Sequence, residues 1–442
     1  MAFAATKESI FSHKVPKWFE DAKLGIFIHW GLYSVPAWAT PTWELGTAPS
    51  ELEWFTNNPY SEWYLNTLRI KGSPTYEYHV KTYGADFPYE KFVDMWKAEK
   101  WDPAKWAGLF KKAGAKYVIP VTKHHDGYCL WDSQYTDYNT AKSGPKRNIV
   151  SELAKAVRGE GMRYGLYYSG LLDWRFTYTP ITDHYDFKFP ENLTYGYADY
   201  AYNQFMELIN LYKPDVLWND IGWPKKGLDD LLTLFAYYYN TVPEGVTNDR
   251  WSEVWHDYRN REYQAGESDF TKTWENTRGI GLSFAYNREE DDKHLLSHHK
   301  LISLLLDTVA QNGNLLINVG PKADGTIPEN QESRLLALGE WMDAHGEGIY
   351  DTRPYDRRHD KAEKDVDVYF TQKDKEVFVF LDNVPAGDSV VTVKGLGAAV
   401  DAAVSMDGGK MTFAASGPDL FVSLNGIGED HYPLGIKLTR NW

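Results

Sequence analysis

The sequence predicts an α/β protein in which a (β/α)8-like barrel is followed by a C-terminal antiparallel β-sandwich, and three observations support this. Near-continuous apolar runs, such as Tyr117-Val118-Ile119-Pro120-Val121, are typical of strands buried on both faces of a parallel sheet. These runs alternate with stretches of helical spacing, as βαβ units require. They also end in polar residues, and a βα-barrel carries its active site at the C-terminal ends of its strands. We therefore expect a site that is spread over many strand ends.

The elements of the barrel follow from hydrophobic periodicity. Strands are predicted at residues 25–29, 116–123, 162–169, 215–220, 245–251 and 315–319. Helices are predicted at residues 89–99, 103–113, 149–159, 199–212, 228–239, 296–311 and 330–345. Residues 38–76 and 252–282 show neither period, and long irregular loops on a compact scaffold often border an active site.

The pattern changes after about residue 350, where short strands follow one another with Gly, Asp and Pro clusters between them. They are predicted at residues 366–370, 376–380, 390–393, 410–413 and 420–424. Such spacing without helices favours a small antiparallel sandwich. A chain of 442 residues also suits two domains, which we place at residues 1–350 and 351–442.

Charge and hydropathy exclude several kinds of partner. The net charge is −15 and there is no Lys/Arg block, which argues against nucleic acid and anionic membranes. No apolar stretch approaches 18 residues, so no membrane span is expected. The N-terminus shows no signal-peptide pattern, which predicts a cytoplasmic protein. A homo-oligomeric state is compatible with these properties.

Aromatic content is the unusual feature of the composition. The chain has 18 Trp and 31 Tyr, and aromatic residues make up 16% of it. Two interpretations fit: a large aromatic core, and flat amphipathic rings that stack on the CH-rich faces of sugars.

The motifs of several common mechanisms do not occur. There is no P-loop, no G-x-S-x-G elbow and no H-E-x-x-H, and Gly279-Ile280-Gly281 lacks the third glycine of a dinucleotide fingerprint. The adjacent His124 and His125 would point to opposite faces of an extended chain, so one metal ion could hardly bind both. We expect neither a metal nor a cofactor.

Acid/base carboxylates remain, as glycoside hydrolysis requires. Asp220 ends a buried strand and is the better-placed nucleophile, although an Asp there can also cap a helix. Nothing in the residues ranks the second carboxylate, for which the candidates are Glu44, Glu62, Glu262, Glu267 and Glu275. The run of residues 289–292, all acidic, is interpreted as solvated surface.

Three histidines lie at predicted strand ends. A neutral imidazole both donates and accepts a hydrogen bond, as a sugar hydroxyl does, so these side chains suit a sugar pocket. Each alone is more often a satisfied buried histidine, and their shared location favours a ligand. They are His29, His124 and His125.

Six segments resemble the α-L-fucosidases of glycoside hydrolase family 29, and the match runs in order from about residue 16 to residue 350. They are Lys23-Leu24-Gly25-Ile26-Phe27-Ile28-His29-Trp30-Gly31, Glu62-Trp63-Tyr64, Thr122-Lys123-His124-His125-Asp126-Gly127, Tyr167-Tyr168-Ser169, Leu217-Trp218-Asn219-Asp220 and Gly313-Asn314-Leu315-Leu316-Ile317-Asn318-Val319-Gly320-Pro321. Members of this family also carry a C-terminal β-sandwich.

The resemblance implies a retaining double displacement. Asp220 matches the nucleophile, and the stretch of residues 257–263 matches the bacterial members in which Glu262 is the general acid/base. Arg250 matches the charged partner near the acid/base. Glu275 is the rival carboxylate and is interpreted as structural.

The resemblance also implies a fucose pocket and a fucosylated oligosaccharide or glycoconjugate as substrate. Residues matching those that hold the sugar hydroxyls are His29, Glu62, His124, His125 and Trp218. Tyr167 would line the pocket near the nucleophile, and Phe284 would pack near the C6 methyl group. The chain departs from many relatives at Ile221-Gly222-Trp223 and at Ala285, which puts leaving-group preference in doubt rather than activity.

The sequence thus predicts an exo-acting retaining α-L-fucosidase. Two alternatives stay open: a non-catalytic fucose-binding protein on the same scaffold, and a retaining glycosidase for another sugar. Transfer of fucose to a sugar acceptor, in place of hydrolysis, also stays open.

Overall fold

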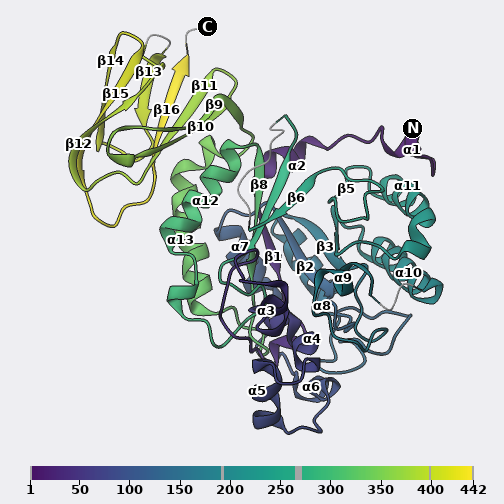
Figure 1. Cartoon of the computed structure of the whole chain (residues 1–442). Coiled ribbons are helices and arrows are strands. Elements are labelled where there is room, and N and C mark those ends of the chain that lie inside the picture. The colour runs from purple at the N-terminus through teal and green to yellow at the C-terminus, as the bar shows by residue number, and fades with distance from the viewer. Residues whose placement is uncertain (1, 191–193, 264–270, 398–399, 441–442) are drawn as a thin grey trace.

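The computed structural model describes residues 2–190, 194–263, 271–397 and 400–440. Figure 1 shows a helix-covered sheet in the N-terminal part and an all-β part at the C-terminus. The predicted fold class, a (β/α)8-like barrel followed by an antiparallel sandwich, is confirmed. No helix within the described ranges is both long and apolar enough to cross a membrane.

The barrel sheet has eight strands in the order β5-β4-β3-β2-β1-β8-β7-β6, and every pairing is parallel. Its strands are β1 (Leu24–Ile28), β2 (Tyr117–Lys123), β3 (Arg163–Ser169), β4 (Val216–Asp220), β5 (Val246–Thr247), β6 (Arg259–Glu262), β7 (Trp274–Gly279) and β8 (Gly313–Val319). The two edge strands approach each other, since the N–H of Asp257 donates to the carbonyl of Thr247 at 2.9 Å. The sheet therefore curls almost closed.

Helices connect most neighbouring strands. They are α7 (Pro103–Lys112), α8 (Ile149–Gly159), α10 (Tyr195–Tyr212), α11 (Leu231–Thr241), α12 (His298–Ala310) and, after β8, α13 (Glu329–His345). Among the described residues, no helix lies between β5 and β6 or between β6 and β7. The barrel therefore departs from a full eightfold repeat at its β5–β7 side, which carries site residues.

The prediction of long irregular loops was wrong at both places. Residues 252–282 contain β6 and β7, and residues 38–76 contain α3 (Glu51–Thr56), α4 (Tyr64–Arg69) and the start of α5 (Pro74–Tyr83). The strand sequences Arg-Asn-Arg-Glu and Trp-Glu-Asn-Thr-Arg-Gly are polar, so they carry no hydrophobic alternation. Residues 89–99 form only a 3-10 turn at Tyr89–Lys91 and α6 (Phe92–Met95).

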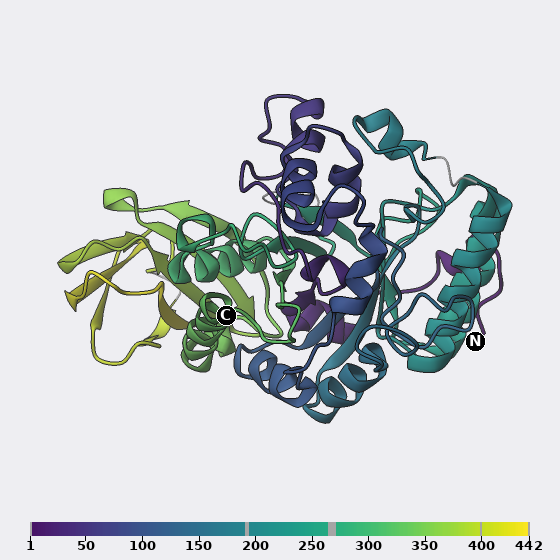
Figure 2. The same cartoon turned by 90° about the horizontal axis from the view of Figure 1, so that it is seen from below.

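Three short helices complete the barrel part: α1 (Lys7–Ile10), α2 (Lys17–Ala22) and α9 (His184–Lys188). Because α3–α6 follow β1 in the chain, they lie beyond the C-terminal ends of the strands (Figure 1). Figure 2, seen from below, shows the β-rich C-terminal part beside the barrel rather than over these helices. The C-terminal part therefore does not cover the end of the barrel at which the strands terminate (Figure 2).

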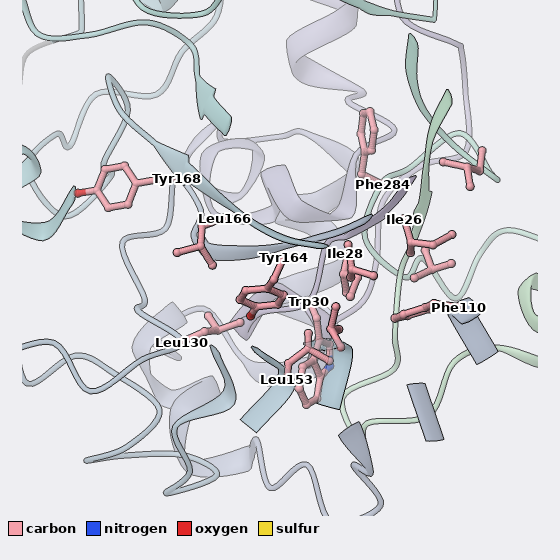
Figure 3. Packing of buried hydrophobic residues seen from close by; sticks show 14 of the residues in the cluster. Ile26, Ile28, Trp30, Phe110, Leu130, Leu153, Tyr164, Leu166, Tyr168 and Phe284 are labelled. Atoms are coloured by element: carbon pink, nitrogen blue, oxygen red, sulfur yellow. The ribbon is translucent and has the colours of Figure 1, made fainter. Parts of the chain in front are cut away.

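Side chains of the barrel strands alternate between two apolar layers. Ile26 and Ile28 of β1 point outward and pack in the layer that includes Phe110 of α7 (Figure 3). Phe27 points inward and packs with Tyr167 and Trp218 inside the barrel, with ring centroids 5.7 and 4.9 Å away. The interior aromatics close the barrel below the site.

The C-terminal part consists of two antiparallel sheets over one core. One sheet has the order β13-β16-β11-β10-β9 and the other β12-β15-β14. The strands are β9 (Arg353–Lys361), β10 (Asp367–Lys373), β11 (Glu376–Asp382), β12 (Gly387–Val393), β13 (Val400–Ser405), β14 (Met411–Ser416), β15 (Asp419–Ile427) and β16 (Leu434–Arg440). Sequence periodicity missed β9, β13 and β16.

The strand β11 is buried on both faces. Val377, Val379 and Leu381 pack in the sandwich core, whereas Phe378 and Phe380 pack in the barrel core against α13. Trp341 of α13 lies 5.8 Å from Phe380, ring centroid to ring centroid. The sandwich is thus joined to the barrel through a continuous apolar layer.

Candidate active site

A cavity of about 250 Å³ opens at the C-terminal ends of the barrel strands. The structure places all ten sequence-predicted site residues on its wall. They are His29, Glu62, His124, His125, Tyr167, Trp218, Asp220, Arg250, Glu262 and Phe284. The strands and the loops after them position these side chains, as expected for a barrel.

Arg250 joins two carboxylates across the cavity. Its Nη1 lies 2.8 Å from Asp220 Oδ1, and its Nη2 lies 2.9 Å from Glu262 Oε2. The guanidinium packs over the Trp218 ring at 4.7 Å. A planar fork of donors suits this role, because it orients both acids at once.

Asp220 ends β4 and is surrounded by donors. The Tyr167 hydroxyl donates to Oδ2 at 2.7 Å, and the N–H of Ile221 donates to Oδ1 at 2.9 Å. Burial alone would raise the pKa of Asp220, but Arg250, His125 and the hydrogen bond from Tyr167 more than offset it, so the pKa lies below its usual value. Asp220 is therefore an ionised carboxylate, as a nucleophile must be.

Ile221 adopts a left-handed backbone conformation, with φ of 68°. A β-branched residue rarely occupies this region, so the turn after β4 is strained. The strained turn aims the Ile221 N–H at Asp220 and brings the Ile221 side chain to the cavity wall. Ile221, at which the chain departs from many relatives, therefore shapes the turn beside the candidate nucleophile.

Glu262 ends β6 and also lines the cavity. The Tyr60 hydroxyl donates to its Oε1 at 3.2 Å. Asn260, two residues earlier on the same face of the strand, accepts from Arg250 at 2.8 Å. The polar sequence of β6 is explained by these contacts, since its inward side chains accept hydrogen bonds from Arg250 and Tyr60 instead of packing in a core.

Glu275 of β7 lies behind Trp218 and is fully buried. Its carboxylate accepts hydrogen bonds from Trp218 Nε1 at 2.8 Å, the Tyr117 hydroxyl at 2.8 Å and Asn260 Nδ2 at 3.0 Å. Burial raises its pKa to about 7. These contacts hold the aromatic floor of the cavity, so Glu275 supports the site from behind.

Glu44, another of the carboxylate candidates, does not line the cavity. Glu44 pairs with Arg278 at 2.9 Å in a neighbouring groove. Glu267 lies outside the described residues.

Two of the histidines present an acceptor to the cavity. Asn318 donates its amide to a carbonyl, so its Oδ1 accepts from His29 Nδ1 at 2.7 Å. Ser169 donates to the Leu172 carbonyl, so its Oγ accepts from His125 Nδ1 at 2.6 Å. In each ring Nε2 is then left as the acceptor.

Burial keeps the cavity imidazoles neutral. It lowers the pKa of His29 to about 4 and that of His125 to about 3, and it lowers the pKa of His124 well below its usual value. His124 Nδ1 has no hydrogen-bond partner among the described residues. The site therefore offers neutral nitrogen atoms that can bind hydroxyl groups.

The family model for α-L-fucosidase matches residues 1–347. The chain belongs to the α-L-fucosidase family of glycoside hydrolases. Within the described residues, no group of three or more His, Cys, Asp or Glu side chains is arranged to hold a metal ion.

Members of the family from distant organisms match most of the chain. An α-L-fucosidase of Dictyostelium discoideum is 35% identical over 369 residues, which is 80% of this chain and 75% of that protein. The plasma α-L-fucosidase of Homo sapiens is 35% identical over 396 residues, 86% of this chain and 78% of that protein.

Solved structures agree over nearly the whole chain. The crystal structure of the Thermotoga maritima α-fucosidase in complex with fucose is 50% identical, with a TM-score of 0.90, and covers 99% of this chain and 100% of that one. A fucosynthase variant from the same organism, in complex with a fucose disaccharide azide, is 52% identical with a TM-score of 0.92 over 99% of this chain and 100% of that one.

A turn at residues 281–286 brings Phe284 to the cavity, and two carboxylates accept hydrogen bonds from this turn. Glu62 Oε2 accepts from the Ala285 N–H at 2.9 Å and from the Ser283 hydroxyl at 3.1 Å. Glu290 Oε1 accepts from the Ser283 N–H at 2.8 Å. Burial raises the pKa of Glu62 to about 7 and that of Glu290 to about 8.

The interpretation of residues 289–292 as solvated surface was wrong for Glu290. A Cβ at Gly281 would lie 1.9 Å from Glu290 Oε2, so only glycine lets this carboxyl group approach the turn. No sequence pattern distinguishes this inward carboxyl group from its acidic neighbours in the run.

We expect Glu290→Ala to raise KM for an aryl α-L-fucoside about tenfold while kcat changes less than about twofold. The change frees N–H groups of the turn, so Phe284 is no longer held at the cavity wall. Steady-state kinetics measure this, and Glu289→Ala is the matched control because Glu289 is exposed. A fall in kcat at constant KM would contradict this positioning role.

The buried imidazoles also predict a pH-dependent stability. Between pH 6.5 and about 4, His29 is protonated in the unfolded chain but neutral in the folded protein. The contribution of His29 to the free energy of unfolding is therefore lost as pH falls through this range. Glu62 acts in the opposite direction, because its raised pKa favours the folded state until pH rises through about 7. The two effects partly cancel in the wild type.

A substitution at His29 separates its contribution to stability from that of Glu62. We expect the cost of His29→Gln to the free energy of unfolding to be smaller at pH 5 than at pH 7, by on the order of 2 kcal/mol. Urea titrations of both proteins at the two pH values measure this difference. An equal cost at both values would mean that His29 is protonated in the folded protein.

Sequence reasoning missed half of the cavity wall. The additional lining residues are Phe27, Leu45, Trp54, Phe55, Tyr60, Trp63, His184, Phe187, Ile221 and Thr277. Tyr60 and Trp63 flank the recognised Glu62, which was a usable signal. Residues of α9 carried none, because the chain brings them to the cavity only through tertiary packing. Those of α3 lie in the stretch 38–76, which was expected to border the site.

Proposed function

We propose that the protein is an exo-acting retaining α-L-fucosidase that releases terminal α-L-fucose from fucosylated oligosaccharides or glycoconjugates. The observation that carries this proposal is the pair Asp220 and Glu262, held on one guanidinium in a blind cavity of a family member. Retaining glycosidases use two such carboxyl groups close together, and a short cavity accepts a chain end.

In the first step, Asp220 Oδ attacks the anomeric carbon while Glu262 gives its proton to the departing glycosidic oxygen. The C1–O bond to the leaving sugar breaks, its electron pair goes to that oxygen, and a fucosyl ester forms on Asp220. The hydrogen bonds from Tyr167 and Ile221 keep Asp220 ionised and oriented before attack.

In the second step, Glu262 takes a proton from water, which attacks the same carbon and releases Asp220 as a carboxylate. Two inversions return the original configuration. If a sugar hydroxyl takes the place of water, the same step transfers fucose to that sugar. Arg250, bonded to both acids, is suited to stabilise whichever of them carries the charge.

Recognition of fucose would combine neutral acceptors with one apolar wall. Nε2 of His29 and of His125 would accept hydroxyl protons, and Glu62 adds a carboxyl group to the same wall. Phe284 packs 4.9 Å from His29, ring centroid to ring centroid, and gives the C6 methyl group an apolar neighbour.

The test is release of p-nitrophenol from a panel of aryl glycosides: α-L-fucoside, β-D-galactoside, α-D-galactoside and β-D-glucoside. We expect turnover of the α-L-fucoside alone. Turnover of another sugar instead would support a glycosidase with a changed pocket. Fucose binding without any turnover would support the binding-protein alternative.

A further inference from the structure

Two short helices from distant parts of the chain form the mouth of the cavity. The helix α3 contributes Trp54 and Phe55, and α9 contributes His184 and Phe187. The catalytic candidates come instead from strand ends and the loops that follow them. The floor, which carries the candidate carboxylates, and the aromatic mouth are thus built from different elements.

The aromatic rings of the mouth form one connected wall. The Phe55 ring lies 6.2 Å from the His184 ring and 5.9 Å from the Trp63 ring, centroid to centroid. Phe187 stacks beside Trp63 at 6.1 Å with 20° between the planes. Such rings offer apolar faces of the size of a pyranose, and aromatic faces pack on CH-rich surfaces.

One carboxylate ties the two helices together. Glu51 Oε1 lies 2.8 Å from His184 Nδ1, and its Oε2 accepts from the His184 N–H at 3.1 Å. Glu51 begins α3 and His184 begins α9, so this contact sets the distance between the helices. Both side chains are more than half exposed, so this contact acts at the surface, beside the packing of Phe55 and Phe187 against the barrel core.

The charge around the mouth is negative. The helices and the residue before α9 carry four carboxyl groups and one lysine: Glu51, Glu53, Asp183, Asp186 and Lys188. A sulfated or carboxylated sugar bound here would lie within a Debye length, about 8 Å at physiological salt, of like charges. A neutral sugar meets no such repulsion.

We propose that α3 and α9 form a leaving-group subsite for the neutral pyranose to which fucose is attached, and that Glu51 positions its two walls. The subsite rests on the proposed fucosidase function and specifies the substrate class for it. The leaving sugar stacks on the Phe187 and Phe55 side of the mouth while fucose occupies the floor.

Substrates with and without a leaving sugar test this. α-L-Fucosyl fluoride places only a fluoride outside the fucose pocket, whereas a fucosyl-galactose disaccharide fills the mouth. We expect Phe187→Ala and Glu51→Ala each to lower kcat/KM for the disaccharide about tenfold and for the fluoride less than about twofold. We expect the wild type to prefer the neutral disaccharide over its galactose-sulfated form by about tenfold.

Two controls match the variants. Glu53→Ala removes another exposed α3 carboxylate, and Tyr185→Ala removes a ring from the exposed face of α9. We expect each control variant to leave kcat/KM unchanged for the fluoride and for the disaccharide. Equal losses on the fluoride and the disaccharide, no loss on either, or a preference for the sulfated sugar would each overturn the subsite. If the wild type turned over neither substrate, the proposed function itself would fail.

Discussion

Asp220→Ala is expected to abolish hydrolysis of every fucoside, with kcat falling by at least about 10⁴-fold whatever the leaving group. The reason is geometric: Asp220 is the ionised carboxylate at the cavity floor, and two donors and Arg250 aim it into the cavity. Steady-state rates on a disaccharide and on aryl fucosides measure the loss.

Added azide identifies the role of the missing group. With the Asp220 carboxylate gone, azide attacks the substrate directly from the vacated side and gives the β-L-fucosyl azide. The product configuration is read by proton NMR. An α-L-fucosyl azide would show that an enzyme ester still forms, and Asp220 would then not be the nucleophile. Circular dichroism controls for folding, because the variant leaves Arg250 with one partner fewer.

The second large effect distinguishes Glu262 from Glu275. We expect Glu262→Ala to lower kcat/KM about 10²–10⁴-fold for a disaccharide, whose leaving group needs a proton. For an aryl fucoside with an acidic phenol the loss should stay within about tenfold, because the phenolate leaves unaided. Azide should restore turnover and give the α-L-fucosyl azide, since Asp220 still forms the ester.

Glu275→Ala should behave differently. It leaves the buried donors on Trp218 and Tyr117 without an acceptor, at a cost of about 1–3 kcal/mol each, and takes one of two acceptors from Asn260 Nδ2. We expect a lower unfolding midpoint and similar activity losses for both leaving groups, without azide rescue. Glu275→Gln, which keeps an acceptor oxygen, is the milder control. If Glu275→Ala instead showed the leaving-group dependence and Glu262→Ala did not, the two roles would be reversed.

The elements that sequence predicted well are those whose side chains pack in apolar cores. The strands β1, β2 and β3 were found as near-continuous apolar runs, because they are buried on both faces, and the helix α8 was found by its apolar period of 3.6. The strands β6 and β7 were missed because their inward side chains, Asn260 and Glu275 among them, bind one another in the barrel. A polar network leaves no hydrophobic period to detect.

By itself, then, the sequence determined the fold class and which residues gather at the strand ends, since both follow from burial patterns and local motifs. Only the tertiary structure placed Glu262 on the cavity wall and Glu275 behind Trp218. It alone brought α9 against α3 and turned Glu290 inward. These are contacts between residues far apart in the chain, and a single sequence carries no record of such distances.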